Sequence, residues 1–83
     1  MPKRLPQAVQ VAPGIVVDPQ IRFGQPVIKG TRVPVAVLLD ELAGGSEVPD
    51  VAREYGITPT DVRAALRYAA GLLAGEDLLV AAR

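Results

Sequence analysis

The sequence predicts a mainly α fold in which short N-terminal strands precede a bundle of three helices. Up to Pro34, short β-branched runs alternate with prolines and glycines, whereas after Pro34 apolar residues recur with helical spacing. With 83 residues the chain has room for one small domain. Because so small a core is only marginally stabilising, we expect the protein to form a homo-oligomer.

The N-terminal part is expected to form a small ribbon after a flexible arm at residues 1–14. Ile15-Val16-Val17 is predicted to be a short strand that ends at Asp18-Pro19, and residues 21–23 are predicted to continue it. Two or three such strands are too few for a free-standing sheet. The ribbon should therefore pack on the helices or pair with a second copy.

The stretch "QPVIKGTRVPV" places two cations around one glycine. A phosphate-binding loop would need spaced glycines followed directly by Lys and Ser/Thr at the start of a helix. Here Lys29 precedes a single glycine, and Arg32 follows the threonine. We therefore predict two short strands, Val27-Ile28 and Arg32-Val33, joined by a tight turn at Lys29-Gly30.

The first two predicted helices are short. The first begins at Pro34, which suits the first helical position, and ends at Gly44-Gly45. Ser46 is predicted to cap the second helix, with Pro49 in its first turn and Gly56 as a left-handed stop. The apolar residues of the first helix recur at helical spacing: Val35, Leu38, Leu39 and Leu42.

A third helix is predicted to follow almost at once. Thr58 is the predicted N-cap, Pro59 takes the first helical position, and Asp61 lies in the first turn, where its charge favours the helix dipole. Arg63 and Arg67 lie one turn apart on a different face from the apolar residues. That apolar stripe comprises Val62, Leu66, Ala69 and Leu73.

The end of the chain is expected to be a separate tail. Gly71 and Gly75 weaken the third helix, so the domain is predicted to span residues 15–75 and the tail residues 76–83. Apolar side chains in such a tail favour a partner surface over water. We expect this contact with a partner protein to involve Leu78, Leu79 and Val80.

Composition excludes several classes of site. The chain has neither cysteine nor histidine, so it lacks thiol nucleophiles, disulfides, thiolate metal sites and the commonest general base. We predict no catalytic residue, no metal site and no cofactor, and we expect a protein that is not an enzyme. The longest apolar run, residues 35–39, is far too short to cross a bilayer, and no secretory signal is recognisable. We therefore expect a cytoplasmic protein without membrane contact.

The net charge of zero hides a gradient along the chain. Residues 1–32 have an excess of four positive charges, and residues 33–62 have an excess of five negative charges. Such asymmetry favours a charged partner or the docking of one copy on another. Ordinary solvated faces are an equally good explanation.

The segment "VPDVAREYGITPTDVRAA", residues 48–65, predicts a helix-turn-helix: a short helix, a turn with glycine and a second helix. A small residue, Ala52, lets the helices cross closely, and Gly56 takes the turn. The helix from Pro59 would then be the recognition helix in a DNA major groove. Asp61 is either a base-reading acceptor for cytosine or a helix-start residue, and the second interpretation is favoured.

Six residues are candidates for DNA contact. Two of them, Lys29 and Arg32, lie outside the predicted recognition helix. Three roles are compatible with each: contact with phosphate, pairing with the acidic residues in the middle of the chain, or simple solvation. The candidates are Thr58, Thr60, Arg63 and Arg67 at the start of the predicted helix, and Lys29 and Arg32 before the first helix.

The order "GQPVIKGTRVPVAVLLDELAGG", "VPDVAREYG" and "ITPTDVRAALRYAA" resembles the bacterial and archaeal family called domain of unknown function 433. The resemblance covers residues 15–70. It implies a homeodomain-like helix-turn-helix fold. It also implies an antitoxin that neutralises a PIN-like nuclease toxin and binds its own promoter, which is double-stranded DNA.

Two functions are therefore compatible with the sequence. The first is a non-enzymatic antitoxin and repressor that acts as a dimer. The second is a small protein-interaction module in which the helix-turn-helix is purely architectural and masks a partner without touching DNA. The modest basicity of Arg63 and Arg67 would give weak DNA binding unless Lys29 and Arg32 or a second copy enlarge the contact.

Overall fold

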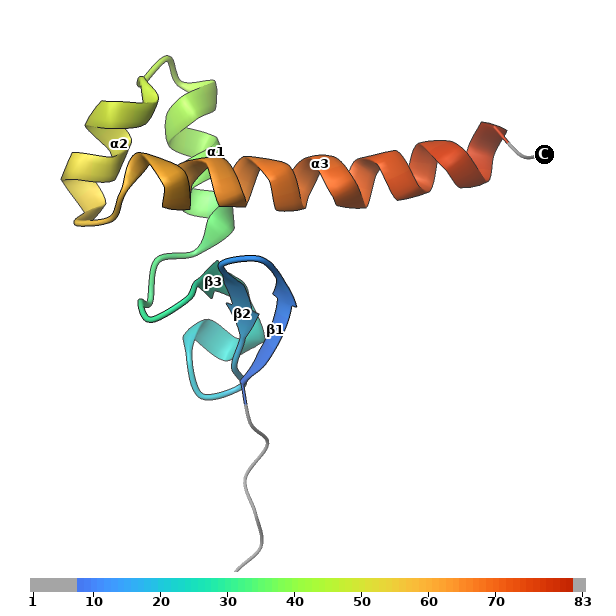
Figure 1. Ribbon diagram of the computed structural model, residues 1–83, viewed down its shortest axis with the longest axis horizontal. Coiled ribbons are helices and arrows are strands. Elements are labelled where there is room, and N and C mark those ends of the chain that lie inside the picture. Colours follow the sequence, from blue (N-terminus) through green and yellow to red (C-terminus); the bar gives the residue numbers. More distant parts are fainter. Residues whose placement is uncertain (1–7, 82–83) are drawn as a thin grey trace, which may run out of the picture.

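The computed structural model describes the backbone of residues 8–81 and the side chains of residues 8–75. A three-stranded antiparallel sheet precedes three α-helices, and the long last helix passes over the sheet and extends beyond it (Figure 1). The prediction that short strands precede three helices is confirmed. The fold is nevertheless mixed α/β rather than mainly α, because the sheet supplies three fully buried core residues, Ile15, Val27 and Ile28.

The sheet has the strand order β1-β2-β3. Strand β1 spans Val9–Ala12, β2 spans Ile15–Val17 and β3 spans Pro26–Ile28. Residues 9–12 had been expected to belong to a flexible arm. That expectation is wrong, because their backbone pairs with β2 through a register that shifts between Gln10 and Ala12.

Two other strand predictions fail for local reasons. Residues 21–23 do not extend β2, because the Asp18 carboxylate accepts the Gln20 N–H at 2.8 Å and turns the chain. A short 3-10 turn, Arg22–Gly24, follows instead. Residues 32–33 do not form a strand either; only an isolated bridge joins Val27 to Pro34.

The tight turn at Lys29-Gly30 is confirmed. Gly30 has a φ of +80°, and the Thr31 N–H donates to the Ile28 carbonyl at 3.0 Å, which closes a turn that favours glycine at this position. The Thr31 hydroxyl donates to the same carbonyl at 2.8 Å and accepts the Val33 N–H at 3.0 Å. The conspicuous "KGT" letters are therefore a structural turn that leads from β3 to the first helix.

Helix α1 spans Val35–Ala43, α2 spans Val48–Tyr55 and α3 spans Pro59–Ala81. Gly56 ends α2 with a φ of 68°, as predicted. Pro34 had been expected at the first helical position but is the extended residue directly before α1. Ser46 does not cap α2, because Glu47 takes that position. The backbone of α3 continues through residues 76–81, so the expected separate tail is helical up to Ala81.

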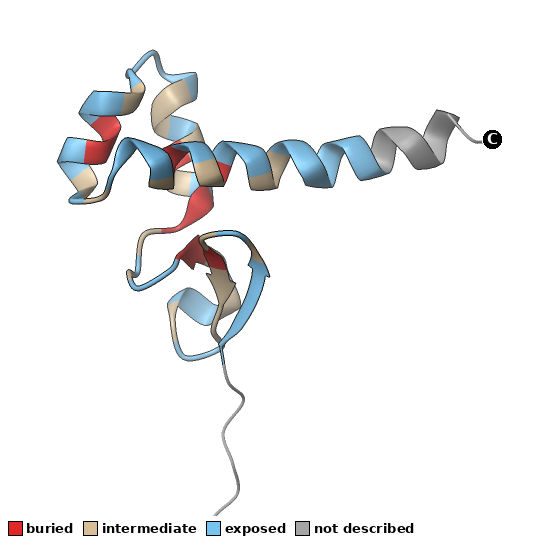
Figure 2. Cartoon of the chain, in the orientation of Figure 1, coloured by how far each residue is buried: buried red, intermediate tan, exposed pale blue. Residues whose placement is uncertain are grey.

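One core joins the sheet to all three helices. Figure 2 shows its buried residues at the crossing of the helices and on the adjacent end of the sheet. Helix α3 contacts α1, α2 and β2, and α1 contacts β3. Among the described residues, none of the helices has the length and apolar character needed to cross a membrane. The core residues are Ile15, Val27, Ile28, Val35, Leu38, Val51, Ala52, Val62 and Ala65.

Candidate nucleic-acid interface at the start of α3

The connection between α2 and α3 is short and firmly held. The Ile57 N–H donates to the Ala52 carbonyl at 2.9 Å directly after the left-handed Gly56. Ala52 itself is buried, and Val51 and Val62 are fully buried in the same cluster. A small residue at the crossing and a glycine in the turn therefore bring α3 close across α2, as the sequence predicted.

A reciprocal pair of hydrogen bonds fixes the start of α3. The Thr58 hydroxyl accepts the Asp61 N–H at 3.1 Å, and the Asp61 carboxylate accepts the Thr58 N–H at 3.0 Å. This is a capping box, with Asp in place of the usual Glu. It confirms Thr58 as the N-cap and supports the interpretation of Asp61 as a helix-start residue, because its carboxylate is already engaged by the backbone.

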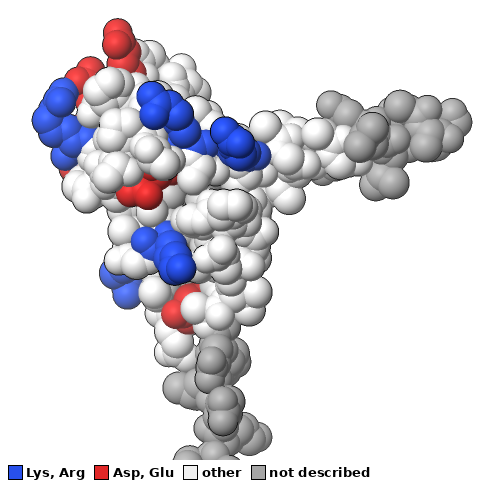
Figure 3. All heavy atoms as spheres, viewed as in Figure 1, with Lys and Arg blue, Asp and Glu red and all other residues white. Residues whose placement is uncertain are grey.

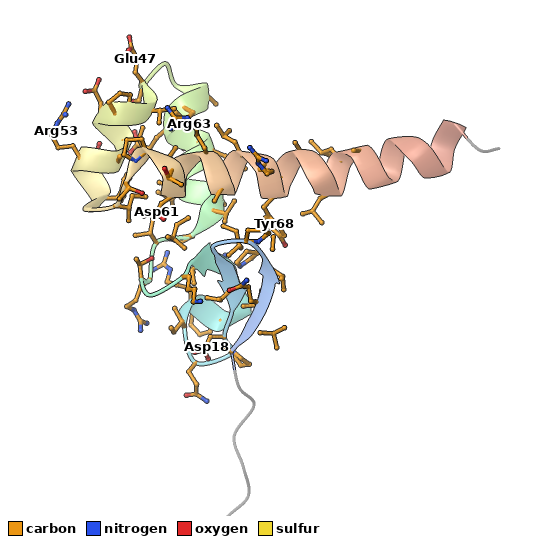
Figure 4. All side chains as sticks on the ribbon, viewed as in Figure 1. Asp18, Glu47, Arg53, Asp61, Arg63 and Tyr68 are labelled. Atoms are coloured by element: carbon orange, nitrogen blue, oxygen red, sulfur yellow. The ribbon has the colours of Figure 1, made fainter. Side chains whose placement is uncertain are left out.

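Three of the candidate DNA-contacting residues lie together on α3. Thr60, Arg63 and Arg67 are exposed, and they line one hollow of about 400 Å³. Figure 4 shows Arg63 and Asp61 on opposite edges of the helix. Asp61 also lines this hollow, with its carboxylate bonded to the Thr58 N–H, and the two arginines remain exposed to an anion. Thr58 is exposed but lies outside this hollow.

The other wall of the hollow is the turn between β1 and β2. Pro13 and Gly14 line it together with Ala64. A Cβ added at Gly14 would lie 3.4 Å from the Cβ of Ala64, so turn and helix are in close contact. Sequence analysis had assigned this turn to the flexible arm and missed it, although a Pro-Gly pair between two valine-containing runs is a recognised turn signal.

Lys29 and Arg32 are exposed but do not line the hollow beside α3. Figure 3 shows basic atoms over the first part of α3 and others over the sheet and its loops, with acidic atoms between them. The Lys29 N–H donates to the Gly14 carbonyl at 2.9 Å. This bond links the Lys29-Gly30 turn to the β1–β2 turn that lines the hollow. Within the described side chains, the observed ion pair joins Arg53 to Asp50. Pairing of Lys29 or Arg32 with the acidic residues of the segment 33–62 is not observed among these side chains.

A partly buried hydrogen bond at the edge of the core links α2 to α1. The Tyr55 hydroxyl donates to the Glu41 carboxylate at 2.7 Å. This bond, with smaller contributions from burial and from the nearby charges of Glu54 and Asp40, raises the pKa of Tyr55 to about 12. Tyr55 is thus an aromatic residue at the edge of the core that positions α2.

Two further expectations concern the rest of the chain. The side chains of Leu78, Leu79 and Val80, expected to bind a partner, lie outside the described residues. Among the side chains that are described, Asp and Glu residues do not gather in threes as they would around a metal ion.

The α2–turn–α3 unit and the preceding "KGT" turn fall within residues 15–69, which match the family described as "Protein of unknown function (DUF433)". The chain belongs to this family. The match extends from β2 through α1 and α2 to about the middle of α3.

Relatives from Mycobacterium tuberculosis are much longer proteins. The chain is 43% identical over 63 residues to "Putative antitoxin VapB45", covering 76% of this chain and 26% of that protein. It is 34% identical over 56 residues to "Uncharacterized protein Rv2308", covering 68% of this chain and 24% of that protein. The crystal structure of Rv2018 is similar with a TM-score of 0.59 and 44% identity, covering 63% of this chain and 24% of that one. The chain thus spans about a quarter of each of these proteins.

We predict that Glu41→Gln lowers the pKa of Tyr55 from about 12 towards the ordinary value of 10, because a neutral amide replaces the carboxylate acceptor. Since the pKa is raised in the folded state, the bond stabilises the fold fully below pH 10, and this contribution is lost as the pH rises towards 12. Absorbance of tyrosinate during an alkaline titration measures the pKa.

Subtracting the titration of Tyr55→Phe isolates the signal of this residue from that of Tyr68. Circular dichroism at each pH confirms that the chain remains folded during the measurement. An unchanged titration midpoint in Glu41→Gln would contradict the assigned hydrogen bond.

Proposed function

We propose that this protein is the antitoxin of a toxin-antitoxin pair, that it neutralises a PIN-like nuclease, and that it binds its own promoter DNA in the cytoplasm. The name of the 43% identical relative supports an antitoxin role. An antitoxin acts by binding, not by turnover, so the protein would be a regulator rather than an enzyme.

The observation that favours DNA binding is the exposed pair of arginines beside the short α2–α3 connection. In a homeodomain-like helix-turn-helix, the first residues of the second helix face the major groove. Here Thr60, Arg63 and Arg67 are exposed on the first three turns of α3. Arginine can contact phosphates or read guanine edges with two hydrogen bonds, so these side chains suit both roles.

The wall formed by the β1–β2 turn enlarges this surface. Because the Lys29 backbone bonds to Gly14, the turn with Lys29 and Arg32 lies next to that wall. In the proposed complex these two cations contact phosphates beside the groove, and Thr58 contributes through its exposed position at the helix start. A homo-oligomer would double the number of contacts, which a chain with so few cations at this surface needs for tight binding.

The toxin would be bound by the end of α3. Leu78, Leu79 and Val80 form an apolar cluster in the sequence of its last turns. A nuclease held there would be separated along α3 from the residues proposed to contact DNA. One protein could then bind both partners.

The second candidate is an interaction module that masks a protein partner without binding DNA. The observation that favours it is the run of residues 68–75, which contains no charged side chain although most of it is exposed. Such a surface suits a protein better than a nucleic acid.

We predict that the double variant Arg63→Ala, Arg67→Ala loses its preference for its own promoter over random duplex while it keeps its fold, since both side chains are exposed. The slope of log affinity against log salt should become shallower by roughly 0.9 for each phosphate that the variant no longer neutralises. Fluorescence anisotropy with labelled duplexes at several salt concentrations measures both effects.

Arg53→Ala is the control for the loss of a surface arginine, because it removes one positive charge from an exposed arginine on α2 that is paired with Asp50. We expect it to bind nearly as well as the unaltered protein. If the unaltered protein, alone and with its toxin, does not prefer its promoter, the DNA-binding half of the proposal is wrong and the masking module stands.

We further predict that deleting residues 78–83 weakens binding to a co-expressed PIN-like protein at least tenfold, because the apolar end of α3 is removed, but leaves the melting temperature nearly unchanged. Co-purification followed by calorimetric titration measures the affinity. Equal affinity of the shortened and full chains would place the toxin contact elsewhere, for example on α1.

A further inference from the structure

The second half of α3 extends past the body of the protein. Figure 1 shows the helix continuing well beyond the sheet and the other two helices, and Figure 2 shows its described residues beyond the core, up to Gly75, as exposed. We call Ala70–Gly75 the overhang, because all six residues are exposed. Leu72 and Leu73 expose 58% and 61% of their surface.

The sequence of the overhang does not favour an isolated helix in water. Two of its six residues are glycines, Gly71 and Gly75, and each costs about 1 kcal/mol relative to alanine inside a helix. Residues 68–75 contain no charged side chain, so no ion pair between successive turns supports this part. A surface that covers the overhang would therefore stabilise its helical state.

The overhang continues the stripe with which α3 contacts the core. Val62 and Ala65 are fully buried, and Leu72 lies on the same face two turns after Ala65. The body of the protein ends before it covers Leu72. This apolar face of α3 is buried at Ala65 and exposed at Leu72. A neighbouring molecule that covered Leu72 would continue the packing along the same face.

Two mainly apolar hollows flank this face. One, of about 250 Å³, lies between β1 and α3 and includes Val11 and Gly71 in its lining. The other, of about 220 Å³, lies between α1 and α3 and includes Leu39 and Ala69. Tyr68 and Leu72 line both, so Leu72 forms a ridge with a groove on each side.

We propose that a second copy of this chain covers the overhang, with the two α3 helices packed around a two-fold axis. In a two-fold interface, both copies contribute the same surface patch. The patch must therefore contain both a projecting side chain and the hollow that receives this side chain from the other copy. The Leu72 ridge and its flanking hollows meet this requirement. The small residues Gly71 and Gly75, which lie beside Leu72 on the helix surface, let two helices approach closely.

Charge also favours a second copy over another partner. Residues 68–75 carry no charge, so they cannot attract a partner through opposite charges. For the same reason, two copies of this segment do not repel each other. Arg63 and Ala74 lie on the face of α3 opposite Leu72. Pairing through Leu72 therefore leaves Arg63 exposed, whereas Arg67 lines one of the flanking hollows. The inference does not depend on the proposed DNA binding.

We predict that the purified protein is a dimer at micromolar concentration and that Leu72→Glu weakens the dimer at least tenfold, because a carboxylate would be buried against the apolar hollows. Sedimentation equilibrium over a range of concentrations measures the dissociation constant. Ala74→Glu is the control: it adds the same charge to the same part of α3 on the opposite face, and we expect it to remain dimeric.

The melting curves of both variants verify that the body is folded. If Leu72→Glu does not fold, Leu72→Asn removes the ridge without adding a charge and should weaken the dimer in the same direction. A monomeric unaltered protein would overturn the proposal. So would a dimer that survives both Leu72 variants but dissociates in Val9→Glu, because the copies would then pair along the exposed edge of β1.

Discussion

Burial of the first half of α3 is the constraint on which the rest of the structure depends. Val62 and Ala65 are fully buried in the same cluster as Ile15 of β2 and Leu38 of α1. This contact fixes how α3 is rotated about its own axis. The rotation in turn decides that Arg63 and Arg67 face outward and that the ridge around Leu72 continues into solvent. Candidate nucleic-acid contact and candidate self-association are two consequences of one packing arrangement.

The polar contacts refine this arrangement rather than create it. The Thr58–Asp61 capping box fixes where α3 begins, and the Tyr55–Glu41 bond holds α2 against α1. The carboxylates in these two contacts are engaged by groups on the protein. In the first turn of α3 the Asp61 carboxylate accepts the Thr58 N–H, so it is engaged by the backbone although it lines the same hollow as Arg63 and Arg67.

Local signals in the sequence predicted the helices better than the sheet. Proline, glycine and capping residues act within one turn, so the start of α3 at Thr58 and the stop at Gly56 could be recognised. Strand β1 was missed because the Pro13-Gly14 pair was not taken as the turn that joins it to β2. The hollow beside Arg63 was missed for a different reason, since it lies between this turn and α3, which are far apart in the sequence. The glycines at 71 and 75 suggested that α3 ends early, whereas the helix continues and leaves an uncovered apolar face.

Hydrogen exchange along α3 at two protein concentrations is the most direct test of this account. The amides of Val62–Tyr68 should exchange slowly at both concentrations, because the core of a single chain protects them. The amides of Leu72–Gly75 should exchange slowly only at the higher concentration, where a second copy covers them. Exchange that is equally fast at both concentrations in Leu72–Gly75, or fast exchange in Val62–Tyr68, would contradict the division of α3 into a core half and a half completed by a partner.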